Sequence, residues 1–242
     1  MTNFVDNREV ERFGAVAADW WNPEGKFRPL HKINPARLFY IREQLLAHTG
    51  RDARSLKPFS GLTILDAGCG GGLVAEPLAR LGARVTGLDP SPETIAVAKG
   101  HAGESGLDIE YLTGTTHDLA GGGRGFDCVL ALEVVEHVPD VGAFLASCAA
   151  LSAPGGLVIL STLNRTAKSY ALGIVAAEYI LGWLPKGTHS WSRFITPDEL
   201  RVKLREAGLE PTGERGLAFD PLRFEWKLTD DCEVNYFMTA RK

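Results

Sequence analysis

The chain has 242 residues, of which 45% are hydrophobic and 23% charged, and its net charge is −4. This composition is typical of a soluble globular protein with a well-filled core. No cluster of Lys and Arg stands out, which excludes the electrostatic pattern of a nucleic-acid-binding protein. The sequence shows neither a signal peptide nor an apolar run of the roughly 18 residues that a spanning helix needs, so we expect a cytoplasmic protein. Its four cysteines are scattered, and free thiols are expected there.

The first sixty residues contain no convincing strand and predict a helical cap over 1–60 that belongs to the same domain as the rest of the chain. Two helical stretches are expected in it, joined by a polar segment that contains proline. For the second helix, Asn34 is the expected N-cap, Pro35 the first helical residue and Gly50 the end.

Strands and helices alternate from residue 62 onward, which predicts an α/β domain with a mainly parallel sheet and helices on both faces. Helices are expected to begin at Ser91, near Asp140 and at Thr196, where capping residues precede helical patterns. The alternation is broken over 163–195, which we interpret as an inserted helical segment in a domain spanning 61–242. The expected strands cover residues 62–66, 83–89, 109–112, 126–132, 157–162, 210–217 and 234–240.

A glycine loop follows the first expected strand, with the sequence Leu-Asp-Ala-Gly-Cys-Gly-Gly-Gly over residues 65–72. Glycines such as Gly68 and Gly70 let the backbone approach a ligand closely and adopt positive φ. Asp89 ends the second strand, where a carboxylate can accept hydrogen bonds from two adjacent ribose hydroxyls. The pattern therefore predicts a cofactor that contains ribose, because a glycine-rich turn without a ligand needs fewer glycines.

Two details favour S-adenosylmethionine over a dinucleotide as that cofactor. A dinucleotide fingerprint requires glycine or alanine at the position that Leu73 occupies. Asp66, just before the loop, suits the cationic amino group of a methionine moiety better than an anionic phosphate. A nicotinamide-dependent oxidoreductase is therefore the weaker of the two enzyme interpretations.

The order of four segments resembles the motifs of class I methyltransferases, which implies a Rossmann-like fold with a mostly parallel seven-stranded sheet flanked by helices. These segments are the glycine loop, Gly-Leu-Asp at 87–89, Phe-Asp at 126–127 and Pro-Gly-Gly at 154–156. Further segments are similar to the ubiquinone biosynthesis O-methyltransferase family, and this resemblance covers the chain from about Phe13 to Lys242. They are Asp-Trp-Trp at 19–21, Phe-Arg-Pro-Leu-His-Lys-Ile-Asn-Pro-Ala-Arg at 27–37, Glu-Val-Val-Glu-His-Val-Pro at 133–139, Ser-Thr-Leu-Asn-Arg at 161–165 and Pro-Lys-Gly-Thr-His at 185–189.

The resemblance implies both the cofactor contacts and the substrates. It places Arg37, Gly68 and Asp89 against S-adenosylmethionine, and Leu132 next to the adenine. It further implies methylation of ring hydroxyls in polyprenylated phenols and quinols, namely 2-polyprenyl-6-hydroxyphenol and 3-demethylubiquinol, with a quinone-biosynthesis protein complex as a further partner. Two alternatives are methylation of another small phenol or catechol, and a non-catalytic membrane adaptor, against which the intact site residues argue.

Glu133, Glu136 and His137 follow the fourth expected strand. If this segment is helical, their i, i+3, i+4 spacing places all three on one face. They could then hold Mg²⁺ with open positions for substrate oxygens, and such an ion would lower the pKa of a phenol hydroxyl. The resemblance to family members that use Mg²⁺ favours this metal set.

Two other interpretations of these residues remain open. Acidic residues in a first helical turn can simply stabilise the helix dipole. Alternatively, His137 is a general base without a metal; Glu133 is the second catalytic candidate. The methyl donor is already activated, so the enzyme needs mainly alignment and deprotonation, and no covalent nucleophile. Cys69 is therefore expected to be a small buried residue.

The segment 165–187 is almost wholly apolar between residues 170 and 184, broken only by Glu178. A helix over that stretch would be roughly 22 Å long, shorter than the ~30 Å hydrocarbon core. Flanking basic residues and Tyr and Trp side chains favour a helix lying on a membrane surface, near a polyprenylated substrate. We therefore expect a peripheral protein at the inner face of the cell membrane, with a lid helix packed on the core as the alternative.

Overall fold

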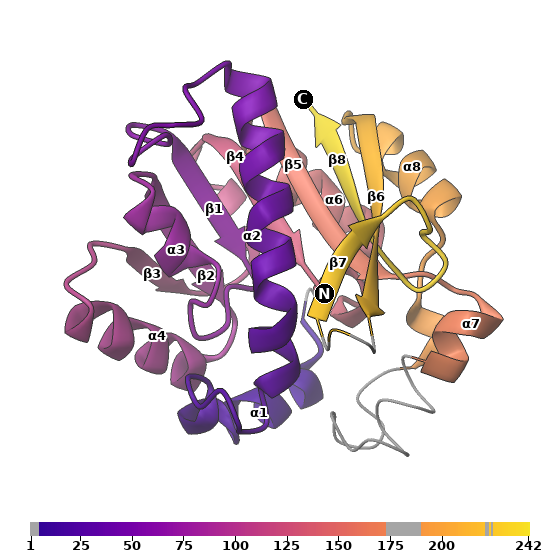
Figure 1. Cartoon of the computed structure of the whole chain (residues 1–242), viewed down its shortest axis with the longest axis horizontal. Coiled ribbons are helices and arrows are strands. Elements are labelled where there is room, and N and C mark those ends of the chain that lie inside the picture. Colours follow the sequence, from indigo (N-terminus) through magenta and orange to yellow (C-terminus); the bar gives the residue numbers. More distant parts are fainter. Residues whose placement is uncertain (1–4, 173–189, 221–222, 224) are drawn as a thin grey trace.

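The computed structural model describes residues 5–172, 190–220, 223 and 225–242, and the strands in these residues form one eight-stranded sheet. Its strand order is β3-β2-β1-β4-β5-β8-β6-β7 (Figure 1). The strands are β1 (Thr63–Ala67), β2 (Arg84–Asp89), β3 (Glu110–Thr113), β4 (Phe126–Leu132), β5 (Ser152–Leu163), β6 (Glu210–Asp220), β7 (Glu225–Thr229) and β8 (Asn235–Arg241).

The sheet is parallel from β3 to β5 and antiparallel from β5 to β7. The predicted mostly parallel α/β architecture is confirmed, but the predicted number of seven strands is wrong. The additional strand is β7, which pairs with β6 and sets Trp226 opposite Phe219. Trp226 and Leu228 alternate along β7 and pack against the core. This period of two was the sequence signal from which the strand could have been predicted.

Helices cover both faces of the sheet. α2, α3 and α4 contribute to the core on one face, and α6 and α8 to the core on the other. Figure 1 shows α2 crossing in front of the sheet, with α6 behind it. The helices are α1 (Asn7–Gly14), η1 (Ala17–Asp19), α2 (Arg28–Thr49), α3 (Ala75–Arg80), α4 (Pro92–Glu104), α5 (Thr116–Ala120), η2 (Val135–His137), α6 (Val141–Leu151), α7 (Ala167–Ser169), η4 (Trp191–Arg193) and α8 (Pro197–Glu206).

The predicted helix starts at Ser91, Asp140 and Thr196 are confirmed, because each side chain caps the helix that follows. The predicted start of α2 at Asn34 is wrong. α2 begins two turns earlier, after Phe27, and Pro35 lies inside it. The Asn34 side chain instead donates a hydrogen bond to the carbonyl of Leu73, at 2.7 Å. A proline in the first turn, at position 29, supplies the start that the sequence analysis assigned to Pro35.

The inserted segment begins after β5 and ends before α8. From residue 173 onward its apolar stretch lies outside the described residues, and most of the predicted surface helix lies outside them as well. Tyr170 and Leu172, at the start of that stretch, are about half exposed. Within the described ranges, no helix combines the length and apolar character needed to cross a membrane.

Candidate functional site

The carboxyl ends of β1, β2 and β4 meet at one edge of the sheet. β1 lies between β2 and β4, so the chain crosses to opposite sides of β1 at this point. Open α/β sheets bind ligands at such a switch point. A cavity of about 1030 Å³ lies there and extends along the edge past β5 to β6 and β7. Of the predicted site residues, those that line it are Arg37, Asp66, Gly68, Asp89, Leu132, Glu133 and His137.

Asp66 is a buried carboxylate beside the cavity, at 3% exposure. Its Oδ2 atom has no hydrogen-bond partner among the described residues. Burial raises the pKa of Asp66 to about 7; the charge of Arg37 opposes this shift and that of Asp89 adds to it. A carboxylate so placed favours a cationic ligand group, because such a group would supply the missing partner.

The glycine loop adopts backbone conformations that side chains tolerate poorly. Gly68 has φ of 74° and Gly70 has φ of 53°, both in the left-handed region. A Cβ atom at Gly68 would lie 2.5 Å from the side chain of Val134, and one at Gly70 would lie 1.9 Å from the ring of Trp20. Both positions therefore require glycine, for conformation and for space.

Asp89 supports the loop from the end of β2. Its two carboxylate oxygens accept hydrogen bonds from the backbone N–H of Gly70, at 3.1 Å, and of Ser91, at 2.9 Å. Burial raises the pKa of Asp89, and these two hydrogen bonds oppose the rise. The carboxylate lies against the cavity, where the sequence predicted a ribose contact.

Arg37 reaches the same edge from α2. Its guanidinium forms an ion pair with Glu133, which also accepts a hydrogen bond from the Ser161 hydroxyl at 2.7 Å. Leu132 ends β4 directly before this pair and is buried. Arg37 is thus held at the cavity by a carboxylate 96 residues away in the sequence.

The predicted helical face of Glu133, Glu136 and His137 is wrong. Glu133 has φ of 52° and stands outside the short 3₁₀ turn Val135–His137, so it shares no helical face with Glu136 and His137. A left-handed non-glycine residue is rare and often marks a functional site. The cause here is that Glu133 leaves β4 and turns its carboxylate toward Arg37 and Ser161.

The three side chains have separate partners instead of a common one. Glu136 is buried away from the cavity and accepts a hydrogen bond from the Thr162 hydroxyl at 2.7 Å, while its Oε1 has no partner among the described residues. His137 Nδ1 lies 3.3 Å from a carboxylate oxygen of Glu9. In the part of the chain that the structure describes, no group of three His, Cys, Asp or Glu side chains is arranged to hold a metal ion. The predicted metal set therefore does not fit as it stands.

Comparison with known proteins assigns the chain to a family. A family model described as a methyltransferase domain matches residues 38–213. The ubiquinone biosynthesis O-methyltransferase of Azorhizobium caulinodans is 55% identical over 237 residues, which cover 98% of this chain and 94% of that protein. Its counterpart in Cereibacter sphaeroides is 55% identical over 236 residues, covering 97% and 96%. The chain belongs to the ubiquinone biosynthesis O-methyltransferase family. The resemblance seen in the sequence is confirmed.

Solved structures confirm the fold of this O-methyltransferase as Rossmann-like and class I. Magnesium protoporphyrin IX methyltransferase from Synechocystis PCC 6803, solved with bound SAH, superposes with a TM-score of 0.69 at 22% identity, covering 98% of this chain and 100% of that chain. A SAM-dependent methyltransferase from Thermotoga maritima gives 0.66 at 17% identity, covering 97% and 98%.

Two groups of residues at the site of this O-methyltransferase were not predicted from the sequence. Glu9 and Phe13 come from α1, and the Phe13 ring meets the His137 ring edge-on at 5.9 Å. Glu9 stands in the first turn of a helix, where an acid is explained by the helix dipole alone, so no local signal marked it. Trp20 packs on the glycine loop, and the Asp-Trp-Trp motif at 19–21 indicated the family but not this contact.

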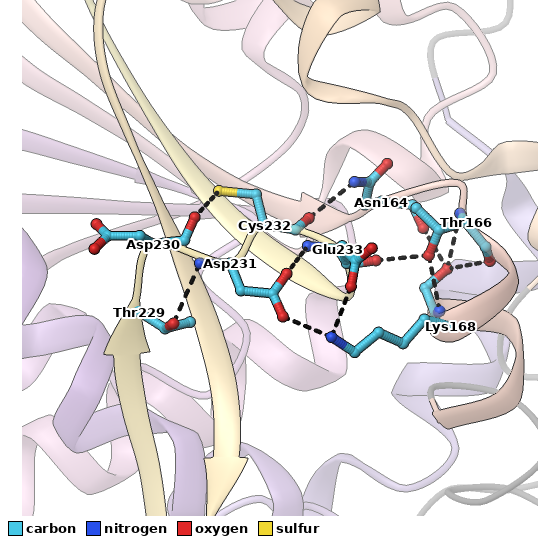
Figure 2. A network of polar contacts seen from close by, with 9 residues as sticks. Asn164, Thr166, Lys168, Thr229, Asp230, Asp231, Cys232 and Glu233 are labelled. Atoms are coloured by element: carbon cyan, nitrogen blue, oxygen red, sulfur yellow. Dashed lines mark hydrogen bonds and ion pairs between the residues drawn. The ribbon is translucent and has the colours of Figure 1, made fainter.

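The start of the inserted segment is fixed to the turn between β7 and β8 (Figure 2). Lys168 Nζ forms ion pairs with Asp231, at 2.6 Å, and Glu233, at 2.7 Å. The Asn164 side chain donates a hydrogen bond to the carbonyl of Cys232, at 2.8 Å. The first residues of the segment therefore lie at one end of the cavity, which Lys168 and Asp231 line.

Proposed function

We propose that this O-methyltransferase transfers a methyl group from S-adenosylmethionine to ring hydroxyls of 2-polyprenyl-6-hydroxyphenol and of 3-demethylubiquinol. The observation that carries the proposal is a single cavity that joins polar cofactor groups to an apolar region. Asp66 and Asp89 line one part of it, and Leu217 and Trp226 line another. Relatives that are 55% identical over nearly the whole chain are ubiquinone biosynthesis O-methyltransferases, which supports the same activity.

The cofactor half of the cavity offers a partner for each part of S-adenosylmethionine. The unpartnered Asp66 oxygen suits the ammonium group, and Arg37 suits the carboxylate of the methionine moiety. Asp89 would accept hydrogen bonds from the ribose hydroxyls, with Gly68 leaving room for the backbone to approach. Leu132 would contact the adenine. The charged groups would contact the methionine end of S-adenosylmethionine and the apolar side chain its adenine end, so the cofactor would bind in a single orientation.

The acceptor half carries a set of apolar side chains that suits a prenyl chain. Leu217 and Phe219 of β6, Trp226 of β7 and Leu172 of the inserted segment line it. Apolar surface that a prenyl unit and the cavity wall remove from water contributes about 25 cal/mol per Å². The prenyl chain would leave the cavity beside the inserted segment. This exit supports a route by which the acceptor passes between a membrane surface and the site.

His137 is the side chain we propose to remove the proton from the acceptor hydroxyl. It lines the cavity, and Glu9 is within 3.3 Å of its Nδ1, so a hydrogen bond there would direct Nε2 away from Glu9. Burial lowers the pKa of His137, but the hydrogen bond to Glu9 and the charges of Glu136 and Glu9 outweigh it, so the pKa is raised overall. A more basic imidazole is better matched to a phenol, whose pKa is near 10. Glu133 would act by holding Arg37 at the cofactor.

The prediction of Mg²⁺ at Glu133, Glu136 and His137 stays a prediction. It would require Glu133 to leave Arg37 and the other two side chains to turn toward it, and no step proposed here depends on it. Chelation decides the matter. Turnover that survives removal of divalent cations is the result that the His137 proposal expects, and turnover that is lost and then restored by Mg²⁺ would overturn it in favour of the metal set.

Attachment to a membrane surface through 165–187 is a further proposal. Tyr170 and Leu172, within that segment, are about half exposed, which supports contact with an apolar phase. The same attachment would place the protein at the inner face of the cell membrane, next to a polyprenylated substrate. A quinone-biosynthesis complex is the partner we propose there.

Two measurements test the proposed function. Quinones extracted from cells that lack this protein should contain the unmethylated phenol or quinol, and an unchanged quinone profile would contradict the proposal. The purified protein should bind S-adenosylhomocysteine and give no response to NADH, whereas binding of NADH would favour an oxidoreductase. A protein that binds cofactor but methylates no phenol would favour the adaptor interpretation.

A further inference from the structure

Asn235 brings one amide group to the part of the cavity wall that β5, β6 and β8 form. It is the first residue of β8, is 5% exposed and lines the cavity. The strand register places it between Leu163 of β5 and Leu217 of β6, and both leucines line the cavity as well. Directly paired residues of antiparallel strands share one face of the sheet, so the three side chains form one row. An amide between two leucines is thus part of the cavity wall.

The amide of Asn235 is incompletely satisfied. Its oxygen is buried and has no hydrogen-bond donor among the described residues. A buried polar atom without a partner is costly, and native proteins contain few of them. A hydroxyl group of a ligand in the cavity would supply the missing donor, and the observation therefore points to a ligand that carries one.

The row that contains Asn235 lies next to the residues that hold Glu133. Phe237 follows two positions along β8 on the same face and pairs with Ser161 of β5, whose hydroxyl donates to Glu133. The cofactor groups Asp66 and Asp89 belong to β1 and β2, on the other side of β4. Asn235 therefore belongs to the acceptor half of the cavity. It is two residues along β8 from Phe237, which pairs with Ser161, the residue that donates to Glu133.

We propose that Asn235 binds the ring oxygen adjacent to the hydroxyl that is methylated, and so positions the acceptor. The proposal rests on the proposed function, because it concerns the acceptor of that same reaction. An amide both donates and accepts hydrogen bonds and carries no charge, so it can hold a hydroxyl in apolar surroundings where a carboxylate would be costly. Leu163 and Leu217 would contact the ring on either side of this hydrogen bond.

The test compares two soluble acceptors that differ by one oxygen. The first is 2-prenyl-6-hydroxyphenol with a single prenyl unit, and the second is 3-prenylphenol, which lacks the neighbouring hydroxyl. Asn235→Leu in the full chain should reduce the ratio of the two kcat/KM values about tenfold, as expected for one lost hydrogen bond that leaves a hydroxyl unpaired. The KM for S-adenosylmethionine and the affinity for S-adenosylhomocysteine should not change, because Asn235 lies outside the cofactor half.

Asn164→Leu is the matched control. Asn164 is also buried at this edge with an unpartnered amide oxygen, but it is not among the cavity-lining residues and it holds the carbonyl of Cys232. This variant should lower the melting temperature and leave the ratio of the two acceptors as in wild type. Asn235→Thr, which keeps a hydroxyl, should recover part of the ratio.

Asn235→Ala decides the question where the leucine variant does not fold, since alanine needs less space than asparagine. A ratio unchanged from wild type in Asn235→Ala would overturn the proposal, as would an equal fall in Asn164→Leu. Failure of the proposed function gives a different result: the wild-type protein would then methylate neither acceptor.

Discussion

Arg37 of α2 and Glu133, the residue after β4, form an ion pair in which the arginine side chain is 6% exposed and the glutamate 18%. The pair joins the N-terminal helices to the carboxyl edge of the sheet. The Ser161 hydroxyl donates a second hydrogen bond to the same glutamate. A buried charge that loses its partner is left without compensation. The pair thus contributes to folding and also places a cation at the proposed position of the cofactor.

Arg37→Met should destabilise the protein by about 3 kcal/mol, because it leaves Glu133 unpaired in a largely buried position. Urea denaturation measures this change. The double variant Arg37→Met/Glu133→Gln should recover part of the loss, since the unpaired charge is gone. Arg205→Met removes an exposed ion pair with Glu210 and should cost only about 0–1 kcal/mol. A double variant no more stable than the single one would contradict the ion-pair argument.

The raised pKa of Asp66 predicts that cofactor affinity depends on pH. Its pKa of about 7 means that the carboxylate is mostly protonated below neutrality, and a bound ammonium group favours the ionised form. The affinity for S-adenosylhomocysteine should therefore rise roughly tenfold between about pH 6 and pH 8. Calorimetry measures it, and Asp66→Asn should bind weakly without this pH dependence.

The same carboxyl group predicts a pH dependence of stability in the ligand-free protein. Because the folded pKa of Asp66 exceeds the ordinary value of 3.8, the native state binds more protons than the unfolded state between these values. The contribution of Asp66 to stability is therefore fully present at low pH and is lost as the pH rises to about 7. At pH 8, Asp66→Asn should unfold at a higher denaturant concentration than wild type. A lower denaturation midpoint for the variant would contradict this prediction, because it would mean that other groups stabilise the buried carboxylate in the wild type.

Asp89→Ala should weaken binding of S-adenosylhomocysteine by about 10- to 100-fold, the expected effect of losing charge-assisted hydrogen bonds to the ribose. Asp89 also accepts hydrogen bonds from the backbone of Gly70 and Ser91, so part of the loss comes from a looser glycine loop. Asp89→Asn, which keeps an acceptor, should lose less. Isothermal titration calorimetry separates these variants from Asp198→Ala, a change of an exposed acid on α8 that should bind as wild type does. Unchanged affinity in Asp89→Ala would remove the ribose assignment.

The inserted segment predicts binding to lipid vesicles. Replacing Ile174, Ile180, Leu181 and Trp183 with Ser should abolish it, because interfacial binding scales with the apolar area inserted. Tyr170→Ser/Leu172→Ser should weaken it, and binding of the wild type should fall with salt, since basic residues flank the segment.

Leu56→Ser is the control for the vesicle experiment, since it changes a leucine that is 91% exposed at a distant loop. It should leave vesicle binding as in wild type. Cofactor affinity should survive all of these substitutions. Loss of cofactor binding in the fourfold variant would identify the segment as a lid, and undiminished vesicle binding would exclude it as the membrane contact.

The amino-acid sequence by itself determined the features that depend on local pattern. The alternation of strands and helices, the caps at Ser91, Asp140 and Thr196, and the glycine loop between Asp66 and Asp89 were all correctly located. Each of these features follows from residues that lie close together in the sequence, within one or two helical turns or in consecutive strands. Their physical causes, namely capping, side-chain period and backbone freedom, act at that short range.

Only the tertiary structure decided which distant groups meet. The φ of Glu133 separates it from Glu136 and His137, and its partner is Arg37 on α2 instead. Glu9 reaches His137 from the first helix, and the register of three strands sets Asn235 in the cavity wall. Such contacts depend on sheet order and helix packing across the whole chain, because a side chain's partner is fixed by where its element lies and not by the residues beside it.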